Sequence, residues 1–288
     1  MNDLTLPDFL IVGTMKSGTS TLADYLQHHE AIHFPDRELH YFDDEDTFKR
    51  GNRWYAEQLT AGVDPGRKPG ALMFGEKTPT YCFQPNCAPR IKEAIPDAKL
   101  IWIFRDPVQR AFSNYLHARK KGSEPLSFRR AIEREDERVK ENIFYGYAQR
   151  SKYAPQVERF LGLFPASNML FLLFEDLVRA PQTELNKATG FLGVEQLGAV
   201  PTSHTNETVM PFFPASLYHA RKLGGYDGLA YRATRKINKK LATRWPRERP
   251  ALPEDVAEHL AAVFAPHNRR LAELTGLDLQ AWRTPAGG

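Results

Sequence analysis

The chain has 288 residues, of which 42% are hydrophobic, and this is enough to bury a sizeable core. Its net charge of +4 comes from basic and acidic residues mixed along the chain, which suits an anionic ligand and gives no reason to expect a nucleic acid partner. No basic leader precedes an apolar segment, and no apolar run approaches the roughly 20 residues of a membrane span. We therefore expect a soluble cytoplasmic protein without stable membrane insertion.

Short apolar runs alternate with helical periodicities along the chain, a pattern typical of parallel strands joined by crossover helices. The predicted strands are Phe9–Val12, Ala71–Gly75, Lys99–Phe104 and Met169–Phe174. The predicted helices are Thr19–His28, Asn86–Ile95, Val108–Lys120, Phe128–Asn142, Pro155–Phe164, Pro181–Leu192 and Glu254–Thr275. Residues 36–70 and 198–250 lack clear periodicity, and we interpret both as loops or lids over a site. The pattern predicts a single α/β domain over residues 1–288, with a mainly parallel central sheet flanked by helices in three layers.

The turn after the first predicted strand has the composition of an anion-binding loop. Its backbone N–H groups would face an anion at the N-terminus of the next helix, and Gly18 would let the backbone approach closely. Lys16 adds a positive charge, and the hydroxyl of Thr19 or Ser20 is also expected to cap the helix. An ATP-binding P-loop has its lysine directly before the last Ser or Thr, so the position of Lys16 argues against ordinary phosphoryl transfer. The alternative is a plain strand-to-helix turn with a surface lysine.

A second charged turn follows the predicted strand Lys99–Phe104. Arg105 stands at the carboxyl end of this strand, where open α/β sheets bind ligands. In the helix that follows, Arg110 and Ser113 are three residues apart and share a face, and an arginine with a serine hydroxyl can clamp a phosphate. The alternative is that Arg105 pairs with Asp106 or another carboxylate and that Ser113 has no role in binding.

Two further segments carry residues suited to proton transfer. In "PDRELHYFDDE", Glu38 and His40 are both able to accept a proton, and the aromatic residues beside them would exclude water. In "GEKTPTYCF", Glu76 and Lys77 reach the same carboxyl edge of the sheet as the other loops. Without that context, the first segment would be interpreted as an acidic surface loop.

The cysteine and histidine residues give no sign of a metal centre. Cys82 and Cys87 are the only cysteines, no second pair stands at zinc spacing, and the nine histidines are scattered. We expect two structural thiols and no bound metal.

Four segments occur in a fixed order: "MKSGTST", "ELHYF", "EKTPTY" and "RDPVQRAFSNY". Together they resemble the sulfotransferases that use 3′-phosphoadenosine 5′-phosphosulfate (PAPS), most closely the heparan sulfate and related carbohydrate branch. The resemblance runs from Phe9 to Tyr115 and continues more weakly to about Leu192. It implies the P-loop-like α/β fold of that family and transfer of a sulfonate group with release of 3′-phosphoadenosine 5′-phosphate (PAP).

The resemblance also assigns roles to single residues. It implies that Glu38 is the general base and that Lys16 contacts the bridging oxygen of the leaving phosphate. Arg105 and Ser113 would bind the 3′-phosphate, which distinguishes PAPS from ATP. The residues expected around the 5′-phosphosulfate are Lys16, Ser17, Gly18, Thr19 and Ser20, and those expected at the catalytic and acceptor site are Glu38, His40, Asp43 and Lys77.

The resemblance leaves the acceptor open. A hydroxyl or amine of a carbohydrate, glycolipid or small natural product fits the family, with PAPS as the co-substrate. The late basic nucleotide loop of several family branches has no clean match after Leu192, although Ala220–Gly225 or Arg232–Lys240 could replace it. The alternatives are a P-loop nucleotide or small-molecule kinase, which would need a differently placed lysine and a Mg²⁺ carboxylate, and a non-catalytic PAP-binding or RNA-binding module.

Overall fold

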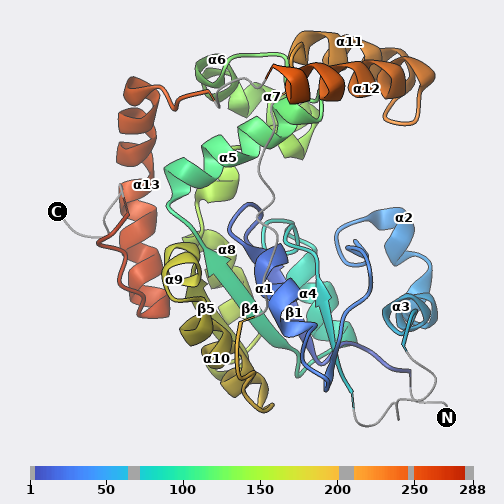
Figure 1. Cartoon of the computed structure of the whole chain (residues 1–288). Helices are drawn as coiled ribbons and strands as arrows, with labels where there is room; N and C mark the ends of the chain where they lie inside the picture. Colours follow the sequence, from blue (N-terminus) through green and yellow to red (C-terminus); the bar gives the residue numbers. More distant parts are fainter. Residues whose placement is uncertain (1–3, 64–71, 201–210, 246–249, 283–288) are drawn as a thin grey trace.

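A computed structural model describes residues 4–63, 72–200, 211–245 and 250–282 of the chain (Figure 1). A five-stranded sheet occupies the centre of the described part, in the order β2-β3-β1-β4-β5. Every neighbouring pair of these strands is parallel, which confirms the predicted α/β fold with a parallel sheet. The strands are β1 (Phe9–Gly13), β2 (Ile32–His33), β3 (Met73–Lys77), β4 (Lys99–Phe104) and β5 (Met169–Leu173).

Helices surround the sheet and extend beyond one edge of it (Figure 1). They are α1 (Thr19–Leu26), α2 (Glu45–Phe48), α3 (Gly51–Leu59), α4 (Cys87–Ala94), α5 (Pro107–Lys120), α6 (Phe128–Glu133), α7 (Glu135–Glu141), α8 (Ala154–Leu161), α9 (Phe174–Arg179), α10 (Pro181–Leu192), α11 (Pro214–Gly224), α12 (Leu229–Arg244) and α13 (Glu254–Thr275). In the described residues, 3₁₀ turns cover Ile143–Tyr145, Gln149–Ser151 and Ala166–Asn168. In the ranges that the structure describes, no helix combines the length and the apolar character needed to cross a membrane.

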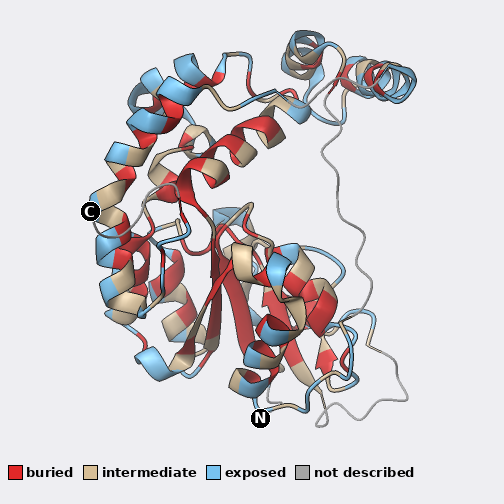
Figure 2. Cartoon of the chain, turned by 60° about the vertical axis from the view of Figure 1, so that its left-hand side comes forward, coloured by how far each residue is buried: buried red, intermediate tan, exposed pale blue. Residues whose placement is uncertain are grey.

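The central strands are buried on both faces because their side chains alternate between two apolar cores. Leu10 and Trp102 point into a core that also contains residues of α3, α4 and α8. Ile11 and Ile103 point to the opposite side, where α1, α9 and α10 supply the apolar partners. Strands that are buried on both faces have continuous apolar sequences, and for this reason "KLIWIF" could be predicted as a central strand. Figure 2 shows this buried centre between partly exposed helices.

A third core joins the helices above the sheet. Val108 and Phe112 of α5 pack with Phe128 of α6 and with Leu260 and Phe264 of α13. This packing fixes the direction of α5, which begins directly at the carboxyl edge of the sheet. The helices α11 and α12 pair with each other beyond the far end of α5 (Figure 1).

Several predicted boundaries differ from the structure. The predicted strand 71–75 is β3 at Met73–Lys77, and the last strand ends at Leu173, where α9 begins. The predicted helix 128–142 is wrong as one element, because it is divided into α6 and α7 at Arg134. The buried carboxylate of Glu135 accepts hydrogen bonds from the amides of Ala148 and Gln149 at 2.8 and 2.7 Å. Such a tertiary contact leaves no mark on the local periodicity.

The interpretation of two irregular regions as loops was also wrong in part. Region 36–70 contains the short helices α2 and α3, while residues 64–71 lie outside the described residues. Region 198–250 contains α11 and the four-turn helix α12, while residues 201–210 and 246–249 lie outside the described residues. The inward face of α12 is narrow, with only Tyr231, Asn238 and Ala242 buried, so its apolar periodicity is weak.

Candidate active site

The loop after β1 is built around Gly18, the N-cap residue of α1. Gly18 has φ of 86°, and a Cβ at this position would lie 2.9 Å from Cδ2 of the Phe174 ring and 3.2 Å from a methyl group of Leu177. Glycine is therefore required both by the backbone conformation and by the close packing. The expected hydroxyl cap is wrong, because no side chain caps α1. This helix end offers its first-turn N–H groups and its positive dipole to an anion.

The inner side of this loop is held by two buried hydroxyl groups. The amide and the hydroxyl of Thr14 donate to the carbonyl of Ile103 at 2.9 and 3.0 Å. Ser17 is fully buried, and its Oγ lies 2.7 Å from Oγ1 of Thr14. The Ser17 hydroxyl thus helps to shape the loop, and its predicted contact with the co-substrate stays a prediction.

Arg105 lies beside the same loop. Its guanidinium donates to the carbonyl oxygen of Lys16 at 3.3 Å and rests over the ring of Phe174, 4.5 Å from the ring centre. β4 lies between β1 and β5 and is parallel to both, so Arg105, at its carboxyl end, meets the residues that follow these two neighbouring strands at one edge of the sheet. Lys16 and Arg105 thereby bring two positive charges to the loop.

Arg110 does not form the clamp that its spacing suggested. Its side chain is only 1% exposed, and its guanidinium donates to Oγ of Ser151 at 2.7 Å and to the carbonyl of Tyr147 at 2.5 Å. These bonds tie α5 to the segment before α8 and leave Arg110 as an internal support. Ser113 is half-buried and shares a face of α5 with His117, four residues later.

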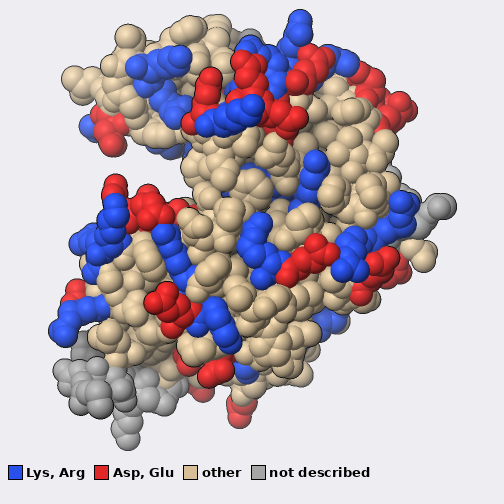
Figure 3. Space-filling view, turned by 180° about the vertical axis from the view of Figure 1, so that it is seen from behind, with Lys and Arg blue, Asp and Glu red and all other residues tan. Residues whose placement is uncertain are grey.

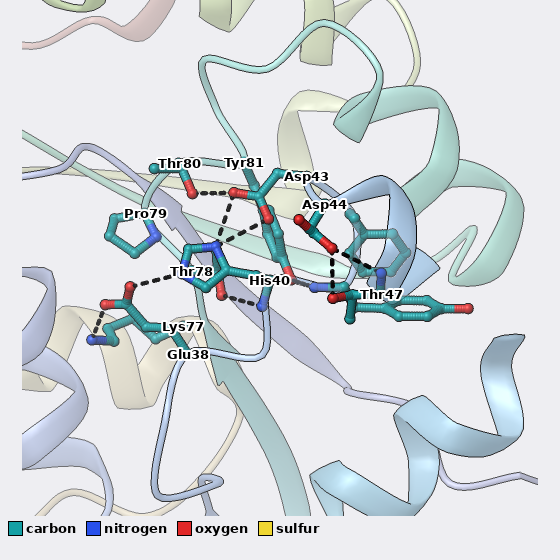
Figure 4. A network of polar contacts seen from close by, with 12 residues as sticks. Glu38, His40, Asp43, Asp44, Thr47, Lys77, Thr78, Pro79, Thr80 and Tyr81 are labelled. Carbon is teal, nitrogen blue, oxygen red and sulfur yellow. Dashed lines mark hydrogen bonds and ion pairs between the residues drawn. The ribbon is translucent and has the colours of Figure 1, made fainter. Parts of the chain in front are cut away.

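The side chain of Lys77 connects three of the predicted segments through an ion pair and a hydrogen bond. Nζ of Lys77, at the end of β3, lies 2.6 Å from Oε1 of Glu38 (Figure 4). The same Nζ donates a hydrogen bond to Oγ of Ser20 at 3.1 Å. Ser20 belongs to the first turn of α1, and Lys77 lies beside Ile11 in the sheet register. The carboxylate of Glu38 therefore lies close to the N-terminal end of α1.

His40 lies between two carboxylates. Its Nε2 is 3.5 Å from Oε2 of Glu38, and its Nδ1 is 3.1 Å from both oxygens of Asp43, which also accepts a hydrogen bond from Thr80 (Figure 4). The hydrogen bonds to Asp43 and then to Glu38 raise the pKa of His40 to about 10. The imidazole is therefore a cation at neutral pH and cannot act as a base there. A raised pKa means that protonated His40 stabilises the fold fully below about pH 6.5 and loses this effect as the pH rises to about 10.

The two glutamates at this edge of the sheet have opposite electrostatic environments. Burial tends to raise the pKa of Glu38, but the hydrogen bonds from His40 and Lys77 outweigh it and lower the pKa to about 2. Glu76 is completely buried, and burial raises its pKa to about 7 despite a hydrogen bond from Thr78. Glu38 is thus ionised and accessible, whereas Glu76 supports the site from within.

Replacing Asp43 with asparagine should lower the pKa of His40 towards its ordinary value of 6.5, because the strongest partner of the imidazolium is lost. NMR titration of the imidazole nitrogens will measure this change. In the wild type, His40 should stay protonated at pH 8, whereas in the variant it should titrate below that pH. The Asp46→Asn variant is the control, since the Asp46 carboxylate is 98% exposed and should leave the titration unchanged. A His40 that titrates equally in all three proteins would contradict the described contacts.

The structure adds supporting residues that the sequence interpretation had not assigned. Thr80 binds Asp43, and the Thr78 hydroxyl accepts a hydrogen bond from the backbone amide of His40 at 3.4 Å. Both stand in the "EKTPTY" segment, so the motif itself was the available signal. His117 of α5 is a further residue near the loop: burial and then the charge of Lys16 lower its pKa to about 4. Its imidazole is therefore neutral.

The predicted thiols are confirmed as structural residues. Cys82 and Cys87 are both buried and unpaired by a disulfide, and burial raises the pKa of each thiol. The Sγ atom of Cys82 packs so closely on β1 that a Cβ on Gly13 would lie only 2.4 Å from it.

Comparison with known proteins agrees with this geometry. The sequence profile described as "Sulfotransferase family" matches residues 7–197. Heparan sulfate glucosamine 3-O-sulfotransferase 6 of Mus musculus is 31% identical over 94% of this chain and 72% of its own length, and the Homo sapiens protein of that name is 30% identical over the same shares. A crystal structure of a sulfotransferase from Alicyclobacillus acidocaldarius is 29% identical, with a TM-score of 0.72 over 97% of this chain and 99% of that one. The chain therefore belongs to the sulfotransferase family, and it is an enzyme that takes its sulfonate group from PAPS and releases PAP.

Proposed function

We propose that this enzyme transfers the sulfonate group to a hydroxyl of an amino sugar in a glycan or glycolipid, with Glu38 as the general base. The observation that carries this proposal is the contact of Lys77 with both Glu38 and Ser20. It places an ionised carboxylate beside the uncapped N-terminus of α1, where the 5′-phosphosulfate of PAPS would lie. An acceptor hydroxyl between the two would face both the base and the reacting sulfur.

A carboxylate with a pKa of about 2 is a weak base, and a loose transition state fits such a base. In sulfuryl transfer, as in much phosphoryl transfer, bond breaking to the leaving group precedes most of the bond formation to the nucleophile. The acceptor proton becomes acidic only as the new bond forms, so Glu38 can take it late in the reaction. Lys77 and the cationic His40 then hold Glu38 in position and keep it ionised before the transfer.

The positive groups at the loop would act on the departing PAP. Lys16 would stabilise the charge that develops on the bridging oxygen, together with the first-turn N–H groups of α1. Arg105 would bind the 3′-phosphate with Ser113, in keeping with its place beside the loop at the end of β4. His40, Asp43 and Lys77 would contact the acceptor or the sulfonate.

Two observations support a sugar as the acceptor. The similar proteins from mouse and human are named for action on glucosamine, at the 3-hydroxyl. In this chain, a cavity of about 160 Å³ adjoins Glu38 and Lys77. Its lining is mostly polar, as recognition of sugar hydroxyls requires, and includes Asp24, Gln27, Asp36 and Arg37.

The acceptor can be tested with PAPS carrying labelled sulfur and three sets of acceptors: glucosamine-containing oligosaccharides, oligosaccharides without amino sugars, and simple phenols. We expect label in the first set and far less in the other two. A glucosamine oligosaccharide blocked at the 3-hydroxyl is the matched control and should lose the label if the position is shared with the relatives. Labelling of phenols in preference to all sugars would overturn the proposed acceptor while leaving PAPS as the donor.

A further inference from the structure

The paired helices α11 and α12, with their connection and short flanks, form a hairpin that we define as residues 211–245. This hairpin contains eight basic residues and a single carboxylate, that of Asp227, and so carries a net charge of +7. Because the whole chain has a net charge of +4, the remaining residues together carry −3. The expectation that charge is mixed along the whole chain was therefore wrong for this segment. The basic residues are Arg221, Lys222, Arg232, Arg235, Lys236, Lys239, Lys240 and Arg244.

Three of the basic side chains, Arg221, Lys222 and Arg244, lie over aromatic rings of the hairpin itself, those of Tyr226, Tyr218 and Trp245. Among the residues that the structure describes, no ion pair joins any of the eight to a carboxylate. In the space-filling view from behind, a notch separates the lobe that carries the hairpin from the part of the molecule that contains the sheet, which we call the body (Figure 3). Such a charge concentration on a projecting element is the electrostatic footprint of an anionic partner.

Large apolar side chains are exposed among these charges. Leu223 is 81% exposed, Leu229 is 83% exposed and Ile237 is 59% exposed. Leu229, Ala233 and Ile237 follow one another at intervals of four residues and so lie along one face of α12, and Lys236 and Lys240 adjoin this face. The opposite face of α12, with Tyr231, Asn238 and Ala242, packs inward. The outer surface thus carries exposed leucine and isoleucine side chains beside lysine side chains. These apolar side chains do not contribute to the buried core of the protein.

The hairpin is anchored to the end of α5, so a partner bound to it would be held at a defined place relative to the site. The hydroxyl of Tyr231 donates to the carbonyl of Lys121 at 3.1 Å, and the hydroxyl of Tyr226 lies 2.7 Å from that of Ser123. Gly122 packs so closely that a Cβ on it would lie 2.8 Å from Leu217. The same helix α5 begins at the carboxyl edge of the sheet, two residues after Arg105.

We propose that the outer surface of the hairpin docks on an anionic lipid bilayer. Lysine and arginine side chains would pair with lipid headgroups, and Leu223, Leu229 and Ile237 would enter the boundary between headgroups and acyl chains, as in helices that lie in a membrane interface. An acidic polysaccharide would match the charge equally well but would give the exposed leucine and isoleucine side chains nothing apolar to contact. The apolar residues therefore favour a lipid surface. This docking is independent of the acceptor proposed above, because it needs neither PAPS nor a sugar.

Sedimentation with vesicles tests the docking directly, using the full chain and no acceptor. Vesicles of phosphatidylcholine and phosphatidylglycerol in equal parts should bind the wild type about tenfold or more tightly than vesicles of phosphatidylcholine alone. The triple variant Lys236→Glu/Lys239→Glu/Lys240→Glu should lose about tenfold or more of this binding. The double variant Leu229→Ser/Ile237→Ser keeps every charge and should lose about tenfold in binding through its missing apolar contacts.

The matched control reverses the same number of charges elsewhere, with Lys49→Glu/Arg53→Glu/Lys140→Glu on exposed positions outside the hairpin. It should bind the anionic vesicles like the wild type. All variants replace exposed side chains, and circular dichroism spectra and melting temperatures equal to those of the wild type, measured without ligand, will show that they are folded. Failure of the wild type to bind, or an equal loss in the control, would overturn the proposal. Undiminished binding by the Leu229→Ser/Ile237→Ser variant would also overturn the proposal. The surface would then bind through charge alone, which fits an acidic polysaccharide as well as a lipid bilayer.

Discussion

Replacing Glu38 with glutamine is expected to lower kcat by about 10²- to 10⁴-fold, the range typical of losing a general base. Glutamine keeps the size of the side chain and can still accept a hydrogen bond from Lys77, but it cannot take the proton of the acceptor hydroxyl. The affinity for PAP should stay within a factor of about two, because Glu38 faces the acceptor and not the nucleotide. Transfer of labelled sulfonate and calorimetric titration with PAP measure the two quantities separately.

The control for this variant is Asp46→Asn, which removes one negative charge from a side chain that is 98% exposed. It should leave both kcat and the PAP affinity unchanged. Unchanged turnover in Glu38→Gln would remove this residue from the mechanism. A loss of PAP binding that equals the loss of rate would instead show that the substitution disturbs the loop after β1.

Replacing Lys16 with methionine is expected to lower kcat by about 10²- to 10³-fold, as when other donors to a developing anion are removed. The charge on the bridging oxygen grows as the sulfonate leaves, so a lysine placed there stabilises the transition state more than bound PAPS. PAP affinity should therefore fall much less than the rate. Single-turnover rates at saturating PAPS will report the chemical step.

The backbone at Lys16 has φ of 75°, which is uncommon for residues other than glycine. Lysine and methionine are both unbranched at Cβ and adopt this conformation with similar strain, so the fold should tolerate the exchange. Lys16→Arg is the matched control, since it keeps the positive charge and should recover part of the lost rate. A methionine variant whose PAP affinity falls as far as its rate would contradict the proposed role, because Lys16 would then act in binding alone.

The parts of the fold that could be predicted are those in which local pattern and tertiary packing agree. The strand Lys99–Phe104 was predicted with its correct bounds because both of its faces are buried. The helix Pro181–Leu192 was also predicted with its correct bounds. Parallel strands bring their carboxyl ends to one edge of the sheet, which is why Lys77 and Arg105 could be expected near the first loop.

The rest depended on contacts between distant residues. Spacing on a helix placed Arg110 near Ser113 but could not show that Ser151 and Tyr147 bind its guanidinium inside the protein. The contact of Lys77 with Ser20 depends on the register of β1 and β3, which the sequence does not reveal. The helix α12 was missed because it buries few apolar residues and owes its place to pairing with α11 and to contacts with the end of α5.

The proposed mechanism requires a site that binds the phosphates at both ends of one nucleotide, and calorimetric titration with PAP and AMP tests this requirement most directly. The two ligands differ only in the 3′-phosphate, which Arg105 is proposed to bind through charge-assisted hydrogen bonds. The wild type should bind PAP at least about tenfold more tightly than AMP, and Arg105→Ala should lose most of this difference. Equal affinities of the wild type for PAP and AMP would contradict the proposed binding of the 3′-phosphate.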